Sequence, residues 1–391
     1  MCSRKWTATW IVAPSARRKI ILATNSAEAS LTIEGVTTVV DSGFAKVPRW
    51  DPSAGIDRLE RVRIGKESAK QLSGRAGRTG PGRAFRMWTE KEEHMFPPRE
   101  VPEIRRTDLA APLLSVLAFS PHDPAVFPWF EAPPAAMIER GVELLRALSA
   151  LERDSFRLTP LGVRLASLPI HPRLGAIVLR GKERGFLGEA SLLAAIASER
   201  DVLRWDVASG RRDVGSSDLL ERHDRLVAFE RDGAQERAAS RWSLDLGGAR
   251  NVLRVRDRLR ALVGPSRDAP PPSEDDLLRL LLAGFADRVA RRVERGSDRV
   301  LLASGGSARI AANSVVKAAD IVLAIDIDGG DVKSRRDGVV RMASEIQLEW
   351  LADDTTNLAE HAFIRFNGTR EVVERVRELR YFAIVFDERI D

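Results

Sequence analysis

With 391 residues, 44% of them hydrophobic, the chain is long enough for two to four compact units, since domains usually run about 100–200 residues. Its single cysteine, Cys2, excludes a disulfide framework and a cysteine metal cluster, and its five histidines show no pair at metal-ligand spacing, so we expect no metal site. The 62 Lys and Arg against 56 Asp and Glu leave a net charge of +6, which favours a polyanionic partner such as nucleic acid.

The N-terminal segment contains a short apolar run, Trp10-Ile11-Val12-Ala13, which soon meets the basic residues Arg17-Arg18-Lys19. A membrane helix needs about 20 apolar residues, and no stretch of the chain approaches this length. The sequence therefore predicts a cytoplasmic protein with no membrane segment.

Two short apolar runs near the N-terminus are typical of buried strands. The first is Ile20–Thr24, and the second, rich in β-branched residues, is Val36–Val40. The segment between them, Asn25–Gly35, has helical spacing in its first half. This order of strand, helix and strand indicates an α/β layer with a parallel sheet, in which ligands bind at the carboxyl ends of the strands.

From about Arg105 to Leu203 the pattern becomes helical, with the Pro133-Pro134 pair between two helices. Phe156–Gly162 is typical of a short strand that turns into another helix, with Thr159 as the cap and Pro160 in the first turn. Two helices followed by such a strand and turn suit a winged-helix unit.

The C-terminal half changes character once more. Residues 172–262 remain helical and rich in arginine, and Gly264–Pro272 forms a linker. Short alternating strands follow, namely Arg299–Leu302, Ile321–Ile325 and Tyr381–Phe386. The sequence therefore predicts a small β-barrel or sandwich at this end.

The strongest chemical signal is the run Gln71-Leu72-Ser73-Gly74-Arg75-Ala76-Gly77-Arg78-Thr79-Gly80. Arg75 and Arg78 fall on one side of a predicted helix, while Gly74 and Gly77 remove side-chain bulk so that another surface can approach. Guanidinium groups in this arrangement can neutralise the charge that grows on a phosphoryl group during transfer. Taken alone, the same pattern also fits a solvated loop of arginine and glycine.

A second motif lies upstream, at Ala23–Ile33, and Asp41-Ser42-Gly43 follows it. The order and spacing of the two motifs resemble motifs V and VI of superfamily-2 helicases, above all the DEAH/RHA group and its bacterial HrpB branch. The chain thus resembles the C-terminal portion of a DEAH-box, ATP-dependent RNA helicase. The resemblance covers roughly residues 18–390 and is densest before residue 205.

The resemblance implies a nucleotide site around the motif Gln71–Gly80. Gln71 would help to position the attacking water and the γ-phosphate, and Arg75 and Arg78 would be the arginine fingers. Gly74 and Gly77 would lie against the bound nucleotide. The cofactor implied is ATP with Mg²⁺.

The upstream motif is implied to contact nucleic acid. Thr24 and Asn25 would bind the RNA backbone and link it to the nucleotide pocket, since a hydroxyl and an amide at a strand end can bond phosphate oxygens without reading sequence. Asp41, at the end of the next strand, is a structural neighbour in this interpretation.

Three residues depart from the family pattern. Leu72 stands where the family usually has arginine, Ser26 replaces an isoleucine, and Ala29 replaces a threonine that can contact nucleic acid in relatives. The first change removes a charge and the third removes a hydroxyl, so weakened activity is expected.

The resemblance also divides the chain into domains. Glu103–Leu109 would open the winged helix, Leu168–Pro172 would lead into the helical domain, and Leu280–Ala290 would belong to the C-terminal region. Lys46–Ile64 would form a hairpin, for which a plain surface hairpin is the alternative. The expected domains are an N-terminally incomplete second RecA-like lobe (1–102), a winged helix (103–170), a ratchet-like helical domain (171–263), a linker (264–274) and an HrpB-type β-rich domain (275–391).

One part that an ATP-driven helicase needs is missing from these 391 residues. The phosphate-binding loop has the form GxxxxGK[S/T], but Gly65-Lys66 and Gly181-Lys182 are each followed by glutamate and lack the earlier glycine. An acidic pair that follows a strand, Asp387-Glu388, lies at the far C-terminus and is not expected to be catalytic. Residues 1–16 do not resemble the usual approach to motif V, which suggests truncation, a frameshifted gene or a misplaced start.

Two functions remain open at this point. The first is half of a 3′-to-5′ helicase on single-stranded RNA, with DNA as the alternative, completed by a first RecA-like lobe supplied in trans or by a longer gene product. The second is a non-catalytic RNA- or protein-binding module. Arg250, Arg254 and Arg258, one helical turn apart, could follow a phosphate backbone, although we favour an ordinary amphipathic helix as their explanation.

Overall fold

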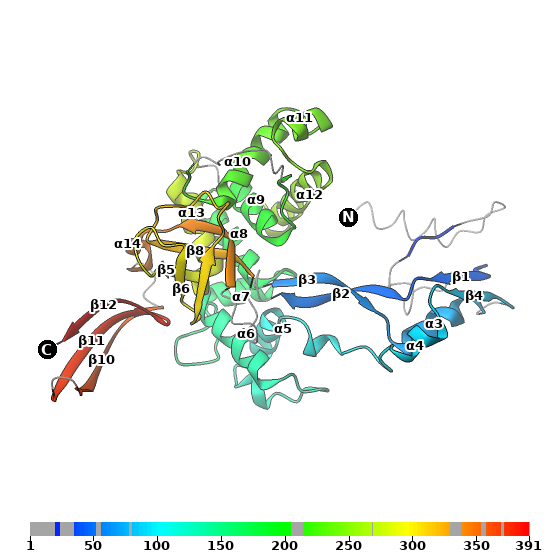
Figure 1. Ribbon diagram of the computed structural model, residues 1–391, viewed down its shortest axis with the longest axis horizontal. Coiled ribbons are helices and arrows are strands. Elements are labelled where there is room, and N and C mark those ends of the chain that lie inside the picture. The colour runs from blue at the N-terminus through cyan, green and yellow to red at the C-terminus, as the bar shows by residue number, and fades with distance from the viewer. Residues whose placement is uncertain are drawn as a thin grey trace. The chain divides into compact units, whose positions relative to one another are not determined.

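The computed structural model describes most of the chain (Figure 1). The described ranges are 20–23, 35–51, 56–77, 80–204, 214–267, 269–328, 338–352, 357–368 and 371–390, with the side chains of 51–59 excepted. The chain forms two compact units. The first consists of Met1–Trp50 and Asp57–Thr107, and the second of Asp51–Ile56 and Asp108–Asp391.

The first unit combines a parallel strand pair, a strand ribbon and two helices. Strands β1 (Thr38–Asp41) and β4 (Arg83–Arg86) pair in parallel, and helix α3 (Lys66–Ala76) packs against both. Strands β2 (Phe44–Asp51) and β3 (Ile56–Arg63) pair with each other. The predicted hairpin is therefore confirmed, and so is a strand at the second apolar run, as β1. The short helix α4 (Glu90–His94) and the 3-10 helix η1 (Glu103–Arg105) complete the unit.

The parallel pair is unusual because one of its faces has no cover among the described residues. Val40 and Phe85 are register partners in β1 and β4, yet they are 67% and 51% exposed. Parallel sheets are normally buried on both faces. The core of the unit lies elsewhere and consists of Ala45, Val47, Ile64, Ala69 and Phe96.

The predicted buried strand over Ile20–Thr24 is wrong where it is described. Residues 20–23 have no regular structure, and Ile20 and Leu22 are 87% and 95% exposed. A strand persists only beside a hydrogen-bonded neighbour, and residues 20–23 pair with none of the described strands. Thr24 and the helix predicted after it lie outside the described residues.

The second unit begins with helices α5 (Ala110–Phe119), α6 (Ala135–Ala147) and α7 (Pro160–Ala166), with the 3-10 helix η2 (Pro124–Val126) between the first two. The predicted cap of α7 is confirmed, because the Thr159 hydroxyl accepts a hydrogen bond from the Gly162 amide at 3.1 Å and Pro160 starts the helix. The strand predicted before it is reduced to one antiparallel bridge, Leu151 to Leu158.

Six further helices follow and share one apolar core with parts of the β-rich end. Helix α9 is apolar on all sides and almost entirely buried, because α8, α10 and α12 pack around it. Gly181 permits this approach, since a Cβ there would lie 2.1 Å from the Cβ of Ala190. The helices are α8 (Pro172–Arg184), α9 (Leu187–Ser198), α10 (Asp218–Arg231), α11 (Glu236–Arg241), α12 (Leu246–Val263) and α13 (Glu274–Phe285).

The β-rich end contains the small barrel that the sequence predicts. Five strands close in the order β5-β6-β7-β9-β8. They are β5 (Val289–Arg292), which follows the 3-10 helix η3 (Ala286–Arg288), β6 (Arg299–Leu302), β7 (Ser307–Ile310), β8 (Ile321–Asp328) and β9 (Gly338–Glu345). Beyond helix α14 (Leu348–Ala352), a separate antiparallel sheet consists of β10 (Leu358–Asn367), β11 (Val372–Tyr381) and β12 (Ile384–Ile390).

The strand predicted over Tyr381–Phe386 is wrong in its extent. β11 ends at Tyr381 and β12 begins at Ile384, so the chain reverses between them. Phe382 takes a positive φ of 49° in this turn, a conformation that a bulky residue rarely adopts. An apolar sequence without glycine gives no sign of such a turn.

Buried polar contacts hold the helices to the barrel. The Asp218 carboxylate, fully buried at the start of α10, accepts hydrogen bonds from the Ser314 hydroxyl at 2.6 Å and from the amides of Val315 and Ala343 at 2.9 Å each. Arg173 of α8 pairs with Asp287 of η3, at 2.7 Å between Nη2 and Oδ2. Burial raises the pKa of Asp287, but the Arg173 guanidinium outweighs this and holds that pKa below its ordinary value.

Asp218→Asn tests how much these contacts stabilise the second unit. Asparagine keeps one acceptor oxygen but turns an NH₂ group toward backbone donors, so we expect a loss of roughly 3 kcal/mol in the free energy of unfolding. Asp275→Asn, the same change on the exposed first turn of α13, serves as the control. Urea unfolding followed by circular dichroism measures both, and equal midpoints would contradict the prediction.

Candidate functional site

Helix α3 carries the predicted nucleotide-site residues and is held firmly at its N-terminus. The amides of Lys66 and Glu67 donate to the carbonyls of Pro97 and Pro98 at 2.9 and 3.3 Å, so a neighbouring segment caps the helix in place of a side chain. Ala69, in the second turn, is fully buried in the core of the first unit. The N-terminal half of α3 is therefore fixed in the first unit, and the motif lies on its C-terminal half.

The C-terminal half of α3 brings Gln71 and Arg75 together one turn apart. Gln71 is exposed, whereas Arg75 is half-buried and engaged in an interaction of its own. The helix ends at Ala76, and Arg78 lies outside the described residues. Thr24 and Asn25, predicted to contact nucleic acid, also lie outside them.

The two glycines of the motif, Gly74 and Gly77, have open surroundings. A Cβ added at Gly74 or Gly77 would meet no atom within 4 Å. Gly82, just past the motif, is different, because a Cβ there would lie 2.0 Å from the Ala76 carbonyl oxygen. Glycine at Gly82 is thus required by the packing of the chain, while the described surroundings of Gly74 and Gly77 set no such requirement. The room beside Arg75 is available to another molecule or surface.

The carboxyl end of β1 lies beside this helix and ends in a buried acid. Asp41 accepts a hydrogen bond from the Gly43 amide at 2.9 Å through Oδ1, while its other oxygen is buried and makes no hydrogen bond. The carboxyl ends of parallel strands are where such sheets bind ligands. The Ile64 amide, just before α3, donates to the Gly43 carbonyl at 3.2 Å, so Asp41 lies toward the start of α3 rather than toward Gln71 and Arg75.

The strand after the motif is fixed by a small charged network. Glu93 accepts hydrogen bonds from the Trp88 indole at 3.0 Å and from Arg86 at 2.9 Å. The Trp88 hydrogen bond, with the Arg86 charge, holds the pKa of Glu93 below its ordinary value despite some desolvation. This network ties the end of β4 to helix α4.

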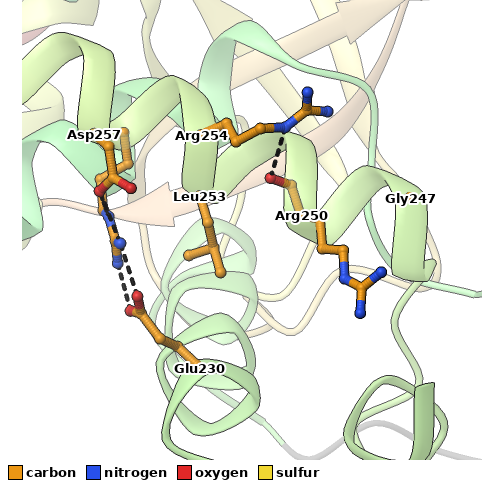
Figure 2. A pocket seen from close by; sticks show the side chains of 7 residues that line it. Glu230, Gly247, Arg250, Leu253, Arg254 and Asp257 are labelled. Carbon is orange, nitrogen blue, oxygen red and sulfur yellow. Dashed lines mark hydrogen bonds and ion pairs between the residues drawn. The ribbon is translucent and has the colours of Figure 1, made fainter. Parts of the chain in front are cut away.

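A second candidate surface is the arginine-rich helix α12 in the other unit. A pocket of about 490 Å³ lies between α12 and α10, with Arg250, Arg254 and Asp257 of α12 around it (Figure 2). Arg250 already donates through Nε and Nη2 to the carbonyl of Ala234, at 3.1 and 3.0 Å. Arg254 donates to Asn251 at 3.2 Å.

The pocket is mixed in charge and one arginine in it is structural. Arg256 binds Glu230 of α10 at 2.8 Å between Nη2 and Oε1, and this hydrogen bond lowers the pKa of Glu230. The opposite face of α12 packs into the core through Val252 and Leu259. Most of the helix is thus explained as an amphipathic core helix, with Arg250, Arg254 and Arg258 exposed on its outer side.

The acidic pair near the C-terminus is engaged in ion pairs with arginines. Asp387 and Glu388 are exposed on β12, where Glu388 binds Arg365 at 3.1 Å and Asp387 binds Arg389 at 3.0 Å.

The described part of the chain offers neither a metal-binding cluster nor a membrane-spanning helix. No group of three or more His, Cys, Asp and Glu side chains in it is arranged to hold a metal ion. None of its helices combines the length and apolar character that a membrane crossing requires.

Two protein-family models match the chain. Residues 9–80 match the helicase conserved C-terminal domain, a range that includes all seven predicted site residues. Residues 141–170 match the winged-helix helicase associated domain (HA2).

Full-length relatives and solved structures agree with these matches. The chain is 34% identical over 306 residues to the ATP-dependent RNA helicase HrpB of Escherichia coli, covering 78% of this chain and 33% of the relative. It is 43% identical over 187 residues to the probable ATP-dependent RNA helicase DHX34 of Homo sapiens, covering 48% of this chain and 16% of the relative. A crystal structure of the E. coli DExH-box NTPase HrpB superposes with a TM-score of 0.58 and 28% identity, over 98% of this chain and 43% of that one.

Gly74→Ala and Gly82→Ala form a matched pair that tests the space beside Arg75. Gly74 lies inside α3 with open surroundings, so alanine should stabilise the first unit by about 0.5–1 kcal/mol through its better helix propensity. Gly82→Ala should destabilise it, because the new Cβ collides with the Ala76 carbonyl. Thermal unfolding decides, and a destabilised Gly74→Ala would show that the space is already filled.

Proposed function

Because the chain corresponds in sequence and fold to the C-terminal portion of DEAH-box helicases of the HrpB kind, we propose that it is the nucleic-acid-binding half of an ATP-dependent RNA helicase motor. The observation that carries the proposal is the display of Gln71 and Arg75 on α3, beside two glycines with open surroundings, within the matched helicase segment. The domain division is proposed as expected from the sequence, with residues 1–102 as the second RecA-like lobe.

In this function α3 completes a nucleotide site that another lobe supplies. Arg75 and Arg78 neutralise charge on the transferred phosphoryl group, and Gln71 orients the attacking water. Gly74 and Gly77 leave room for the nucleotide to approach the helix. When bound, ATP with Mg²⁺ supplies the phosphoanhydride bond whose hydrolysis drives the motor.

The incomplete site on α3 is consistent with a nucleotide site shared between two lobes. These 391 residues contain no GxxxxGK[S/T] loop to cradle phosphates. Arg75 and Gln71 can stabilise a transition state but cannot by themselves hold the nucleotide and its metal. A first RecA-like lobe, in trans or from a longer gene product, supplies the rest.

The nucleic-acid partner in this proposal is single-stranded RNA, moved in the 3′-to-5′ direction. Thr24 and Asn25 grip its backbone without reading bases. The alternative is a non-catalytic RNA- or protein-binding module. The observation that favours it is the outer face of α12, where Arg250, Arg254 and Arg258 are exposed at helical spacing.

ATP hydrolysis and RNA binding by the purified chain distinguish these functions. We expect no turnover by the chain alone, with or without single-stranded RNA, and RNA binding that weakens as salt rises. RNA-stimulated turnover that disappears in the Arg75→Ala, Arg78→Ala double variant would mean that the chain holds a phosphate site of its own. Absence of RNA binding at low salt would contradict both functions on RNA.

Adding a separately produced first lobe of an HrpB-type helicase tests the catalytic half of the proposal. RNA-stimulated hydrolysis should appear, and Arg75→Ala should lower its kcat by about 10³-fold or more, as loss of an arginine finger does. Lys91→Ala, which removes an exposed charge from α4, is the control and should leave kcat unchanged. Equal rates for the two variants would remove Arg75 from the proposed role.

A further inference from the structure

Arg292, at the end of β5, differs from the other buried arginines that the structure describes. Arg173, Arg222, Arg288 and Arg292 are each at most 8% exposed. The first three have an aspartate oxygen at 2.7, 2.6 and 3.9 Å respectively. No described carboxylate forms an ion pair with Arg292. A buried charge without a paired charge is costly, so the charge of Arg292 lacks the compensation that the other three have.

Neutral carbonyl groups hold the Arg292 guanidinium in place. Its Nε donates to the Ala319 carbonyl at 2.6 Å, and its Nη2 donates to the Val316 carbonyl at 3.1 Å. Its Nη1 donates to the carbonyl of Ser297. A guanidinium has five N–H groups, so these three bonds leave one N–H on each terminal nitrogen for a further acceptor. The described residues thus fix the orientation of this side chain without matching its charge.

Two acidic side chains act on Arg292 through space, but other arginines engage them. Asp298 binds Arg309 at 3.2 Å between Oδ2 and Nη1. Asp320 binds Arg295 at 3.3 Å between Oδ2 and Nε. Burial lowers the pKa of Arg292, and the charges of Asp320 and Asp298 offset this only in part. Because arginine does not lose its proton in proteins, the surplus positive charge persists at neutral pH.

Arg292 lines a pocket at the surface of the barrel. The pocket has a volume of about 330 Å³ and lies between the turn after β5 and the segment after β7. Ile310 and Val316 give it apolar walls. Lys317, an exposed residue, also lines it, and its Nζ donates to the Ala312 carbonyl at 2.7 Å. Since an ammonium group has three N–H donors, Lys317 keeps donors for a ligand as well.

We propose that this pocket binds a phosphate group, either inorganic phosphate or the terminal phosphate of a nucleotide. A phosphate monoester carries about −1.5 to −2 charges near pH 7, which matches the two cations Arg292 and Lys317. A planar guanidinium also fits phosphate oxygens well, through charge-assisted hydrogen bonds. The acidic residue of the lining, Asp298, is neutralised by its ion pair with Arg309. The pocket belongs to the second unit, so the inference does not rest on the proposed motor function.

The two cations differ in how cleanly a substitution tests them. The carbonyl bonds of Arg292 also brace the barrel, so Arg292→Lys, which keeps the charge but loses the planar fork, should also lower stability. Lys317 is exposed and contacts one carbonyl, so Lys317→Ala removes its charge with little effect on folding. Arg237→Ala, which removes an exposed charge from α11 in the same unit, is the matched control.

Isothermal titration calorimetry of the full chain with sodium phosphate, at constant ionic strength, measures the binding. We expect saturable binding to the parent chain and to Arg237→Ala with the same Kd. Lys317→Ala should raise the Kd about 5-fold, the effect of one exposed charge, and Arg292→Lys should raise it about 10-fold or more. Circular dichroism checks that each variant is folded. If Arg292→Lys unfolds, Lys317→Ala still decides.

Adenosine monophosphate and adenosine, titrated in the same way, identify the source of the phosphate. Tighter binding of the nucleotide than of inorganic phosphate would assign the pocket to a nucleotide's terminal phosphate, whereas weaker or equal binding would assign it to the free ion. Adenosine, which lacks the phosphate, should not bind. Adenosine bound as tightly as its monophosphate would overturn the proposal, because the phosphate would then contribute nothing.

Three further results would overturn it. The first is no binding of inorganic phosphate or of adenosine monophosphate at concentrations up to about 10 mM. The second is the same Kd for the parent chain and Lys317→Ala, which would place the phosphate elsewhere. The third is an equal loss of affinity in Arg237→Ala, which would make the effect one of net charge rather than of this pocket.

Discussion

The constraint on which the second unit depends is that a buried polar group must find its hydrogen bonds inside the protein. Asp218 is fully buried and would be costly if any of its acceptor positions were empty. Ser314, Val315 and Ala343 fill them from two different parts of the barrel end, which fixes α10 against the barrel at one orientation. Apolar packing alone would hold the helices together without choosing this orientation.

The first unit differs from the second, because the surroundings of its candidate site are left open. Arg75 and Gln71 are displayed at the end of a helix whose other end is tightly capped. The two glycines of the motif add space that the described surroundings do not use. A half-site on a helix whose other end is capped is the form expected of a surface that works only when a second surface closes on it, since catalytic groups gain most from being positioned beforehand.

Features set by neighbouring residues could be predicted from the sequence. The Thr159 cap with Pro160 behind it is an example, because both effects act within one turn of helix. Features set by distant residues could not. Ile20–Thr24 has the composition of a strand but no described partner, and the bond from Ser314 to Asp218 joins residues 96 positions apart. The turn at Phe382 was hidden because no glycine marks it.

The same distinction between neighbouring and distant residues applies to the candidate site. The spacing of Arg75 and Arg78 suggested their chemistry, but only the structure shows that Gly74 is free to change while Gly82 is not. The spacing of the arginines on α12 also predicted correctly that they share one face. Arg250, however, already donates hydrogen bonds to the Ala234 carbonyl. Sequence spacing identifies which side chains share a face, whereas their hydrogen-bond partners depend on the tertiary fold.

The uncovered face of the β1–β4 pair has a practical consequence for handling the chain. Val40 and Phe85 stand side by side and largely exposed, on strands with free edges among the described residues. Such a surface is an aggregation hazard, because apolar faces and open edges on different molecules can pair. The colloidal stability of a purified sample should therefore depend on concentration, and low protein concentration with a mild solubilising additive is the sensible starting condition.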